Sequence, residues 1–277
     1  MTDPSTHTDR KRITLGYSPC PNDTFIFHGI ASGALRLPGY DMVEQLHDVE
    51  TLNAMAMEKR LDVTKLSFHA WLRLKDNYRL LQSGAALGFG CGPILIARRP
   101  LARSDIDTCR VVLPGQWTTA HLLFRLWAPK AEDKYFAPYD RIFTEIESGR
   151  ADCGVIIHEN RFTFEAAGFQ AVVDLGAWWE HETGMPIPLG CIAAKAEMGE
   201  NAISAVESLI GDSIRMAKED PESTLHYMRR YAQEMEIDVL HKHVRTFVNE
   251  FSLDLGVKGR AAVAELERRD RDAGVIQ

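Results

Sequence analysis

Short apolar, strand-like runs alternate with segments of helical periodicity between Ile13 and Ala194. This alternation is typical of an α/β protein, in which helices cross over between the strands of a largely parallel sheet. At 277 residues the chain is also longer than a single hydrophobic core usually serves. We therefore expect an α/β fold with two lobes.

Two apolar segments, at residues 93–98 and 188–194, bracket a middle α/β unit. If both cross between lobes, residues 1–98 and 189–277 form a large discontinuous lobe, and residues 99–188 form a small one. This arrangement predicts a two-hinge clam shell with a ligand cleft between its lobes. The remaining C-terminal segments all show helical spacing, so we expect the large lobe to end in helices.

Composition and charge narrow the choice of partners. The formal net charge of -7 disfavours a nucleic-acid partner, which would require a basic face. No run of 18 apolar residues is present, so no membrane partner is expected. Five scattered cysteines without a CxxC pair, and a polar N-terminus without an apolar signal segment, predict a cytoplasmic location. These patterns leave the oligomeric state open.

Polar side chains follow several predicted strands, at the positions where open α/β sheets bind their ligands. Several of these groups begin a helix, where free backbone N–H groups and the helix dipole favour a negative ligand. We therefore expect a site for a small carboxylate or a polyol. The candidate residues are Ser18–Thr24 (which includes Asn22 and Asp23), Lys65–Ser67, Thr118–Thr119 and His158–Arg161.

Most of these residues also have a purely structural explanation. Asn22 or Asp23 can cap the helix that runs to about Ser32, and Ser67 and Thr118 are also residue types that cap helices. Lys65 can lie at a sheet edge with its ammonium group in water. Thr119 is harder to explain in this way, because capping does not require a second hydroxyl.

His158 directly follows the apolar, β-branched run Cys153–Ile157. A histidine at the end of a buried strand can take a proton near neutral pH, and it can equally be a core residue bonded to the backbone. No histidine spacing typical of zinc, no Gly-x-Ser-x-Gly motif and no phosphate loop is present. We therefore expect neither a metal nor an organic cofactor.

Six segments, in matching order, resemble the 1,4-dihydroxy-6-naphthoate synthase family of the futalosine route to menaquinone. They are Ser18–Phe27, Asp48–Asn53, Thr64–Ser67, Thr118–Thr119, Ile156–Phe162 and Val173–Trp179. The likeness extends from about Ile13 into the C-terminal helices. One small departure is Asn160, where the family frequently has serine.

The resemblance implies a two-lobed periplasmic-binding-protein type of fold (class II-like) and a carbon–carbon lyase. The substrate would be cyclic dehypoxanthine futalosine, and the products 1,4-dihydroxy-6-naphthoate and dihydroxyacetone. By matching motifs, His158 would accept a proton. The segment Lys65, Leu66 and Ser67, together with Thr118 and Thr119, would hold the substrate, while Asn22, Asp23 and Arg161 are candidates to line the cleft.

Two alternatives remain at this point. One is a chorismate dehydratase of the same pathway, which has the same fold. The other is a cytoplasmic protein that binds a small carboxylate without catalysis. The His-Glu-Asn-Arg-Phe segment and the paired threonines favour the synthase. The sequence leaves open whether Glu159 or Arg161 orients the imidazole of His158.

Overall fold

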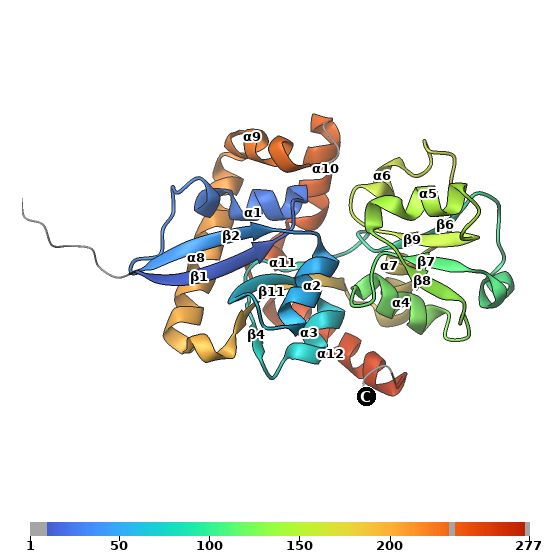
Figure 1. Ribbon diagram of the computed structural model, residues 1–277, viewed down its shortest axis with the longest axis horizontal. Coiled ribbons are helices and arrows are strands. Elements are labelled where there is room, and N and C mark those ends of the chain that lie inside the picture. The colour runs from blue at the N-terminus through green and yellow to red at the C-terminus, as the bar shows by residue number, and fades with distance from the viewer. Residues whose placement is uncertain (1–9, 233–235, 275–277) are drawn as a thin grey trace, which may run out of the picture.

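The strands form two separate sheets, which lie side by side in a computed structural model of the chain (Figure 1). The structure describes residues 10–232 and 236–274, so the polar N-terminal segment lies outside its scope. We call the first sheet and its helices the first lobe, and the second sheet and its helices the second lobe. No helix within the described residues is long and apolar enough to cross a membrane.

The first lobe combines N-terminal strands with C-terminal helices. Its sheet has the order β2 (Tyr40–Leu46), β1 (Lys11–Tyr17), β3 (Val63–Ser67), β11 (Ile187–Lys195) and β4 (Tyr78–Leu80), and β5 (Ala86–Gly88) also pairs with β11. Its helices are α1 (Pro21–Ala31), α2 (Val49–Met57), α3 (Phe68–Leu74), α8 (Glu200–Glu219), α9 (Pro221–Tyr231), α10 (Ile237–Phe247), α11 (Glu250–Leu253) and α12 (Gly256–Asp272). The C-terminal helical region was therefore predicted correctly.

The second lobe is built from one continuous stretch of chain. Its sheet has the order β10 (Gln170–Asp174), β6 (Ile94–Ala97), β9 (Cys153–Ile156), β7 (Val111–Leu113) and β8 (Lys134–Phe136). Its helices are α4 (Thr119–Trp127), α5 (Ile142–Glu147), α6 (Asn160–Thr163) and α7 (Leu175–Thr183). Short 3-10 turns lie at Arg103–Thr108, Tyr139–Arg141 and, beyond β11, Ala196–Met198.

The structure corrects the predicted boundaries of the two lobes. The strand at 94–97, which we assigned to the first lobe, pairs with β9 and β10 and so belongs to the second. The chain therefore crosses between β5 and β6, before residue 98, and it has returned to the first sheet by Ile187. An apolar run in the sequence indicates that a strand is buried, but it does not indicate to which sheet the strand belongs.

The sheets are mixed, whereas the sequence suggested largely parallel ones. β1 pairs in parallel with β2 and β3, but β11 runs antiparallel to β3, β4 and β5. In the second lobe β6 is antiparallel to both β9 and β10. The two antiparallel strands, β6 and β11, are the first strands after each crossover. A chain that arrives from the other lobe enters the sheet from the opposite end.

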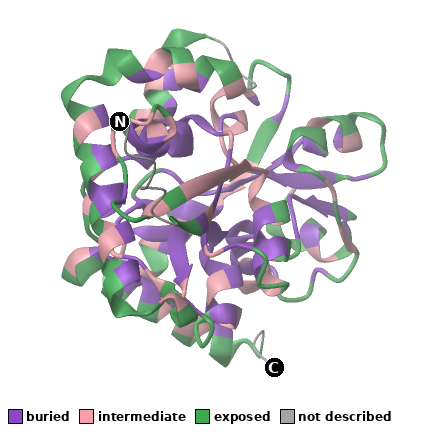
Figure 2. Ribbon diagram, turned by 60° about the vertical axis from the view of Figure 1, so that its left-hand side comes forward, coloured by how far each residue is buried: buried purple, intermediate pink, exposed green. Residues whose placement is uncertain are grey.

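Helix α4 of the second lobe joins the two cores. It contacts α3, β11 and α12 of the first lobe, and its buried side chains belong to a cluster that continues from Leu66 in β3 to Val111 in β7. Figure 2 shows buried residues extending through the centre of the molecule from one sheet to the other. The two lobes are therefore packed against each other along one side of the cleft.

The crossover from β5 to β6 lies directly against the start of α7. A Cβ atom on Gly92 would come within 2.3 Å of the Cα of Gly176, and within 2.5 Å of its nitrogen. Beside this close approach, the Leu175 amide donates a hydrogen bond to the Pro93 carbonyl at 2.9 Å. Only a residue without a side chain allows this approach of two backbones.

We predict that Gly92→Ala lowers the free energy of unfolding by about 1–3 kcal/mol, because backbone atoms on both sides must move to admit the methyl group. Urea denaturation followed by circular dichroism measures the change. Gly211→Ala in α8 is the matched control, because its new methyl group meets side-chain atoms alone, the guanidinium of Arg215 at 3.3 Å and the Ser83 hydroxyl at 3.5 Å. That variant should be neutral or more stable by up to about 1 kcal/mol. Equal stability of Gly92→Ala and wild type would contradict the packing argument.

Candidate active site

The carboxyl ends of strands from both sheets face one pocket between the lobes. β1 and β3 are parallel neighbours in the first sheet, and β7 and β9 are parallel neighbours in the second. The pocket holds about 670 Å³ of empty space, counting the part open to solvent. It is lined by Ser18, Asn22, Asp23, Val49, Lys65, Ser67, Ala86, Cys91, Gly92, Pro93, Thr118, Thr119, Ala120, Ile157, His158, Arg161, Leu189, Gly190 and Phe247.

Of the residues proposed to act as base, hold the substrate or line the cleft, the pocket brings together all but Leu66. Of the wider candidate segments, Pro19–Pro21, Thr24, Glu159 and Asn160 are not among the lining residues. Successive side chains of a strand point to opposite faces. Lys65 and Ser67 of β3 therefore face the pocket, while Leu66 between them packs into the hydrophobic core, fully buried. Because the Leu66 side chain lies in the core, it cannot contact a ligand in the pocket.

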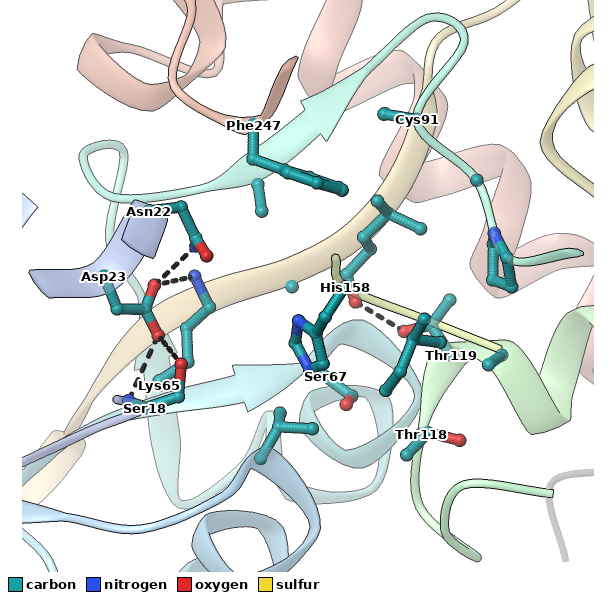
Figure 3. A pocket seen from close by; sticks show the side chains of 18 of the residues that line it. Ser18, Asn22, Asp23, Lys65, Ser67, Cys91, Thr118, Thr119, His158 and Phe247 are labelled. Atoms are coloured by element: carbon teal, nitrogen blue, oxygen red, sulfur yellow. Dashed lines mark hydrogen bonds and ion pairs between the residues drawn. The ribbon is translucent and has the colours of Figure 1, made fainter. Parts of the chain in front are cut away.

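A buried ion pair joins α1 to β3 on the floor of the pocket (Figure 3). The Lys65 ammonium donates to Asp23 Oδ1 at 2.8 Å, and the two side chains are 6% and 0% exposed. Asp23 also accepts hydrogen bonds from the backbone amide and the hydroxyl of Ser18 and from the Asn22 amide. Removal of either charge would leave its partner buried without compensation, so the pair acts as a unit.

The start of α1 differs from the sequence prediction. We expected Asn22 or Asp23 to cap this helix, but Cys20 is the N-cap and Pro21 occupies the first helical position. A proline is favoured there because its missing N–H would have had no partner. Asn22 and Asp23 therefore lie within the first turn, where their side chains line the pocket and bond to one another, and to His243 and Lys65 respectively, rather than cap the helix.

The paired threonines at the start of α4 have different roles. Thr118 caps the helix, because its hydroxyl accepts from the His121 amide at 3.2 Å and donates to the Gly115 carbonyl. The hydroxyl of Thr119 donates to the Leu189 carbonyl at 2.7 Å, and this bond crosses between the lobes. Substrate binding by Thr119 stays a prediction, and it would have to share a hydroxyl that already holds β11.

Ser67 is held in place by Asn53, a residue that the sequence analysis did not single out. The Asn53 side chain accepts from the Ser67 amide at 2.9 Å and donates to the Ser67 hydroxyl at 3.2 Å. Ser67 is the N-cap residue of α3, but its own side chain makes no capping hydrogen bond. Asn53 lies within the Asp48–Asn53 motif, and that motif was the available signal.

His158 has an unusual backbone conformation that directs its side chain into the pocket (Figure 3). Its φ angle of 58° lies in the left-handed region, which few residues other than glycine adopt. The imidazole is partly buried and its ring packs edge-on against Tyr139, with centroids 4.9 Å apart. Burial lowers the pKa of His158, although the negative charges of Glu159 and Asp23 oppose that shift.

The imidazole of His158 contacts Cys20 rather than Arg161. Nδ1 of His158 lies 3.5 Å from the Cys20 sulfur, within reach of a weak hydrogen bond. Arg161 instead donates to the Gly92 carbonyl and pairs with Asp174 at 3.2 Å. Nε2 of His158 is buried and has no hydrogen-bond partner among the described residues. Burial raises the pKa of the Cys20 thiol, so this contact is between neutral groups.

His243 of α10 is a second buried histidine near the site, and it was not among the residues proposed from the sequence. Its Nε2 lies 3.0 Å from Asn22 Oδ1, and its ring stacks near that of His158, with centroids 6.5 Å apart. Burial lowers the pKa of His243 well below its ordinary value. The signal that could have found it is its place on one helix face with Leu240 and Phe247, both buried.

Comparison with known proteins identifies the family. A family model described as menaquinone biosynthesis matches residues 13–272. The chain belongs to the menaquinone biosynthesis family. A 1,4-dihydroxy-6-naphthoate synthase of Thermus thermophilus is 46% identical over 92% of each chain. A protein of the same name from Streptomyces coelicolor is 38% identical over 95% of this chain and 94% of that one.

Solved structures confirm the predicted fold of this menaquinone biosynthesis protein. A protein of Archaeoglobus fulgidus superposes with a TM-score of 0.91 at 28% identity, over 96% of this chain and 98% of that one. The ligand-binding component of an import system of Staphylococcus aureus superposes with a TM-score of 0.71 at 11% identity, over 96% and 93% of the two chains. The fold is therefore of the periplasmic-binding-protein type.

Two further histidines, His69 in α3 and His121 in α4, face each other across the lobe interface, with ring centroids 5.9 Å apart. Burial, and then the nearby Arg73, lower the pKa of His69 to about 3. Burial lowers the pKa of His121 to about 4, against an opposing hydrogen bond to the Gln116 carbonyl. Both rings are therefore neutral in the folded protein at pH 7.

We predict that the protein loses stability as the pH falls below about 6.5. The unfolded chain binds protons near that pH, whereas the folded chain does not bind them at these two histidines until about pH 4 and 3. The stabilisation is therefore complete above pH 6.5 and is lost progressively toward the folded pKa values. Urea denaturation at pH 7.5 and 5.5 measures the change, and each histidine should contribute about 1.4 kcal/mol at pH 5.5.

His121→Gln should reduce this pH dependence, because one titrating group is gone. His181→Gln is the control, because the side chain of His181 is 87% exposed. If His121→Gln showed the full wild-type loss between pH 7.5 and 5.5, His121 would not be a source of the acid sensitivity.

Proposed function

We propose that this protein is a 1,4-dihydroxy-6-naphthoate synthase, a carbon–carbon lyase of menaquinone biosynthesis that acts on cyclic dehypoxanthine futalosine. The observation that carries the proposal is the imidazole of His158, which projects into a pocket between two lobes. Burial also lowers the pKa of this imidazole. The likeness to two synthases along nearly the whole chain supports the choice of reaction. The products would be 1,4-dihydroxy-6-naphthoate and dihydroxyacetone.

His158 is proposed to be the general base. Its lowered pKa keeps the ring neutral at pH 7, so one nitrogen has a lone pair ready to take a proton. If Nδ1–H donates to the Cys20 sulfur, the lone pair is on Nε2, the nitrogen without a protein partner among the described residues. The sulfur of Cys20 would then select the tautomer that the reaction requires.

The polar groups of the first lobe would bind the substrate and stabilise the enolate that forms when the proton leaves. The Lys65 ammonium places a positive charge beside the pocket, and Asp23 fixes its position. The Ser67 hydroxyl, oriented by Asn53, supplies a second polar group. Fixed dipoles and charges in a site that excludes water stabilise a developing negative charge strongly. Formation of the aromatic ring drives cleavage of the carbon–carbon bond, so no electron carrier is needed.

We also propose that this pocket binds a small-molecule carboxylate substrate, that the protein has no nucleic-acid or membrane partner, and that it is cytoplasmic. All five cysteines are free and buried, which suits a reducing compartment.

The test is turnover of cyclic dehypoxanthine futalosine by the purified protein and by His158→Asn. Asparagine tolerates the left-handed backbone of residue 158 but cannot accept the proton. We expect kcat to fall about 10²–10⁴-fold, with little change in KM or in melting temperature. His226→Asn, at an exposed position in α9, is the control and should keep full activity.

Each contrary outcome has a distinct meaning. Consumption of chorismate in place of this substrate would assign the protein to the dehydratase of the pathway. Binding of the substrate without turnover by the wild-type protein would leave a carboxylate-binding protein. Turnover that survives in His158→Asn would place the general base elsewhere in the pocket.

A further inference from the structure

Glu50 forms a contact between the two lobes that the motifs above do not explain. It lies in the first turn of α2 in the first lobe, beside the N-cap Asp48. Its Oε1 and Oε2 accept the backbone amide of Trp117 at 2.9 and 3.2 Å. Trp117 belongs to the loop of the second lobe that leads into Thr118 and α4. A single carboxylate thus holds the backbone of the opposite lobe, next to the pocket.

The same carboxylate is connected to the substrate pocket through Asn53. The Asn53 amide donates to Glu50 Oε2 at 3.1 Å and to the Ser67 hydroxyl at 3.2 Å. Asn53 is fully buried and also accepts from the Ser67 amide. A continuous chain of hydrogen bonds therefore runs from Trp117 in the second lobe through Glu50 and Asn53 to Ser67 in the first.

The loop of the second lobe is shaped to receive this carboxylate. A Cβ atom on Gly115 would lie 2.5 Å from the Glu50 carboxyl carbon, so the glycine leaves the space that the carboxylate fills. Burial raises the pKa of Glu50, and the hydrogen bonds from the Trp117 amide and Asn53 oppose that rise. A partly buried carboxylate held by donors from two lobes is more than a surface contact.

We propose that Glu50 is a positioning residue that couples closure of the two lobes to the alignment of Ser67 through Asn53. When the lobes close, the Trp117 amide engages Glu50, and the carboxylate then restrains the Asn53 amide that orients the Ser67 hydroxyl. When the lobes open, Glu50 loses its partner in the second lobe, and this restraint on Asn53 weakens. The effect on catalysis rests on the proposed function, because it requires Ser67 to contact the substrate.

The contact itself is tested without substrate, by hydrogen exchange of the Trp117 amide. In Glu50→Ala that amide has lost its acceptor, so a peptide covering residues 114–118 should exchange at least tenfold faster than in wild type. Glu58→Ala, at the exposed C-cap of the same helix, is the matched control and should leave this peptide unchanged. Unchanged exchange in Glu50→Ala would overturn the proposal.

The coupling is tested by kinetics with cyclic dehypoxanthine futalosine. Glu50→Ala should raise KM at least tenfold, with a smaller change in kcat, because His158 is untouched while the alignment of Ser67 is lost. Glu50→Gln should recover part of the loss, since its carbonyl oxygen still accepts the Trp117 amide. An unchanged KM in Glu50→Ala, or a loss confined to kcat, would contradict a positioning role.

Gly115→Ala approaches the same contact from the other lobe. Its methyl group would displace the Glu50 carboxylate without substituting any residue of the first lobe, so it should reproduce the faster exchange and the raised KM. The φ angle of Gly115, 158°, also strains an alanine at this position, so this variant is read only together with the Glu50 variants. If Glu50→Ala unfolds, Glu50→Leu, which fills the space without an acceptor, takes its place in both tests. Absence of turnover in wild type would refute the proposed function, while the exchange experiment would still decide whether Glu50 holds the two lobes together.

Discussion

The site is built around the buried ion pair between Lys65 and Asp23. A charge in a protein interior is costly unless its partner and its other hydrogen bonds are in place. Asp23 meets this condition because Ser18 and Asn22 donate to the same carboxylate. The pair thereby fixes the loop between β1 and α1 against β3. Asn22 extends the arrangement to α10, where its side-chain oxygen faces His243.

The position of this pair explains why distant segments must fold together to form the pocket. Ser18 follows β1, Lys65 lies in β3, and His243 belongs to a helix far along the chain. His158 comes from the other sheet and meets the first lobe through Cys20, the N-cap of α1. The helix start that carries Asp23 therefore also supplies the contact for the imidazole. A shift of α1 would therefore disturb both the Lys65–Asp23 ion pair and the proposed base, His158.

Features that depend on local chemistry were predictable from the sequence. Thr118 caps α4 as expected, and the apolar run at 153–156 delivers His158 to the pocket. Features that depend on which segments meet were not. The strand at 94–97 was assigned to the wrong lobe, because its apolar pattern suits either sheet. Leu66 shared a motif with two pocket residues, yet strand alternation turns it into the core.

The residues that support the site were the hardest to find. Glu50, Asn53 and Cys20 lie within segments that resemble the family, but their residue types alone did not indicate which residues they contact. His243 looked like an ordinary polar position because its partner, Asn22, is more than two hundred residues away in the chain. Hydrogen bonds between distant segments leave no periodic pattern in a sequence, so only the three-dimensional arrangement reveals them.

The place of β11 in the first sheet has a consequence for synthesis on the ribosome. This strand lies between β3 and β4, yet it leaves the exit tunnel only after the entire second sheet has been translated. The second sheet, by contrast, comes from one uninterrupted stretch, residues 94–174, so all of its strands are synthesised before β11. The middle segment of the nascent chain can thus fold first, while β3 keeps an unpaired edge until its late neighbour arrives.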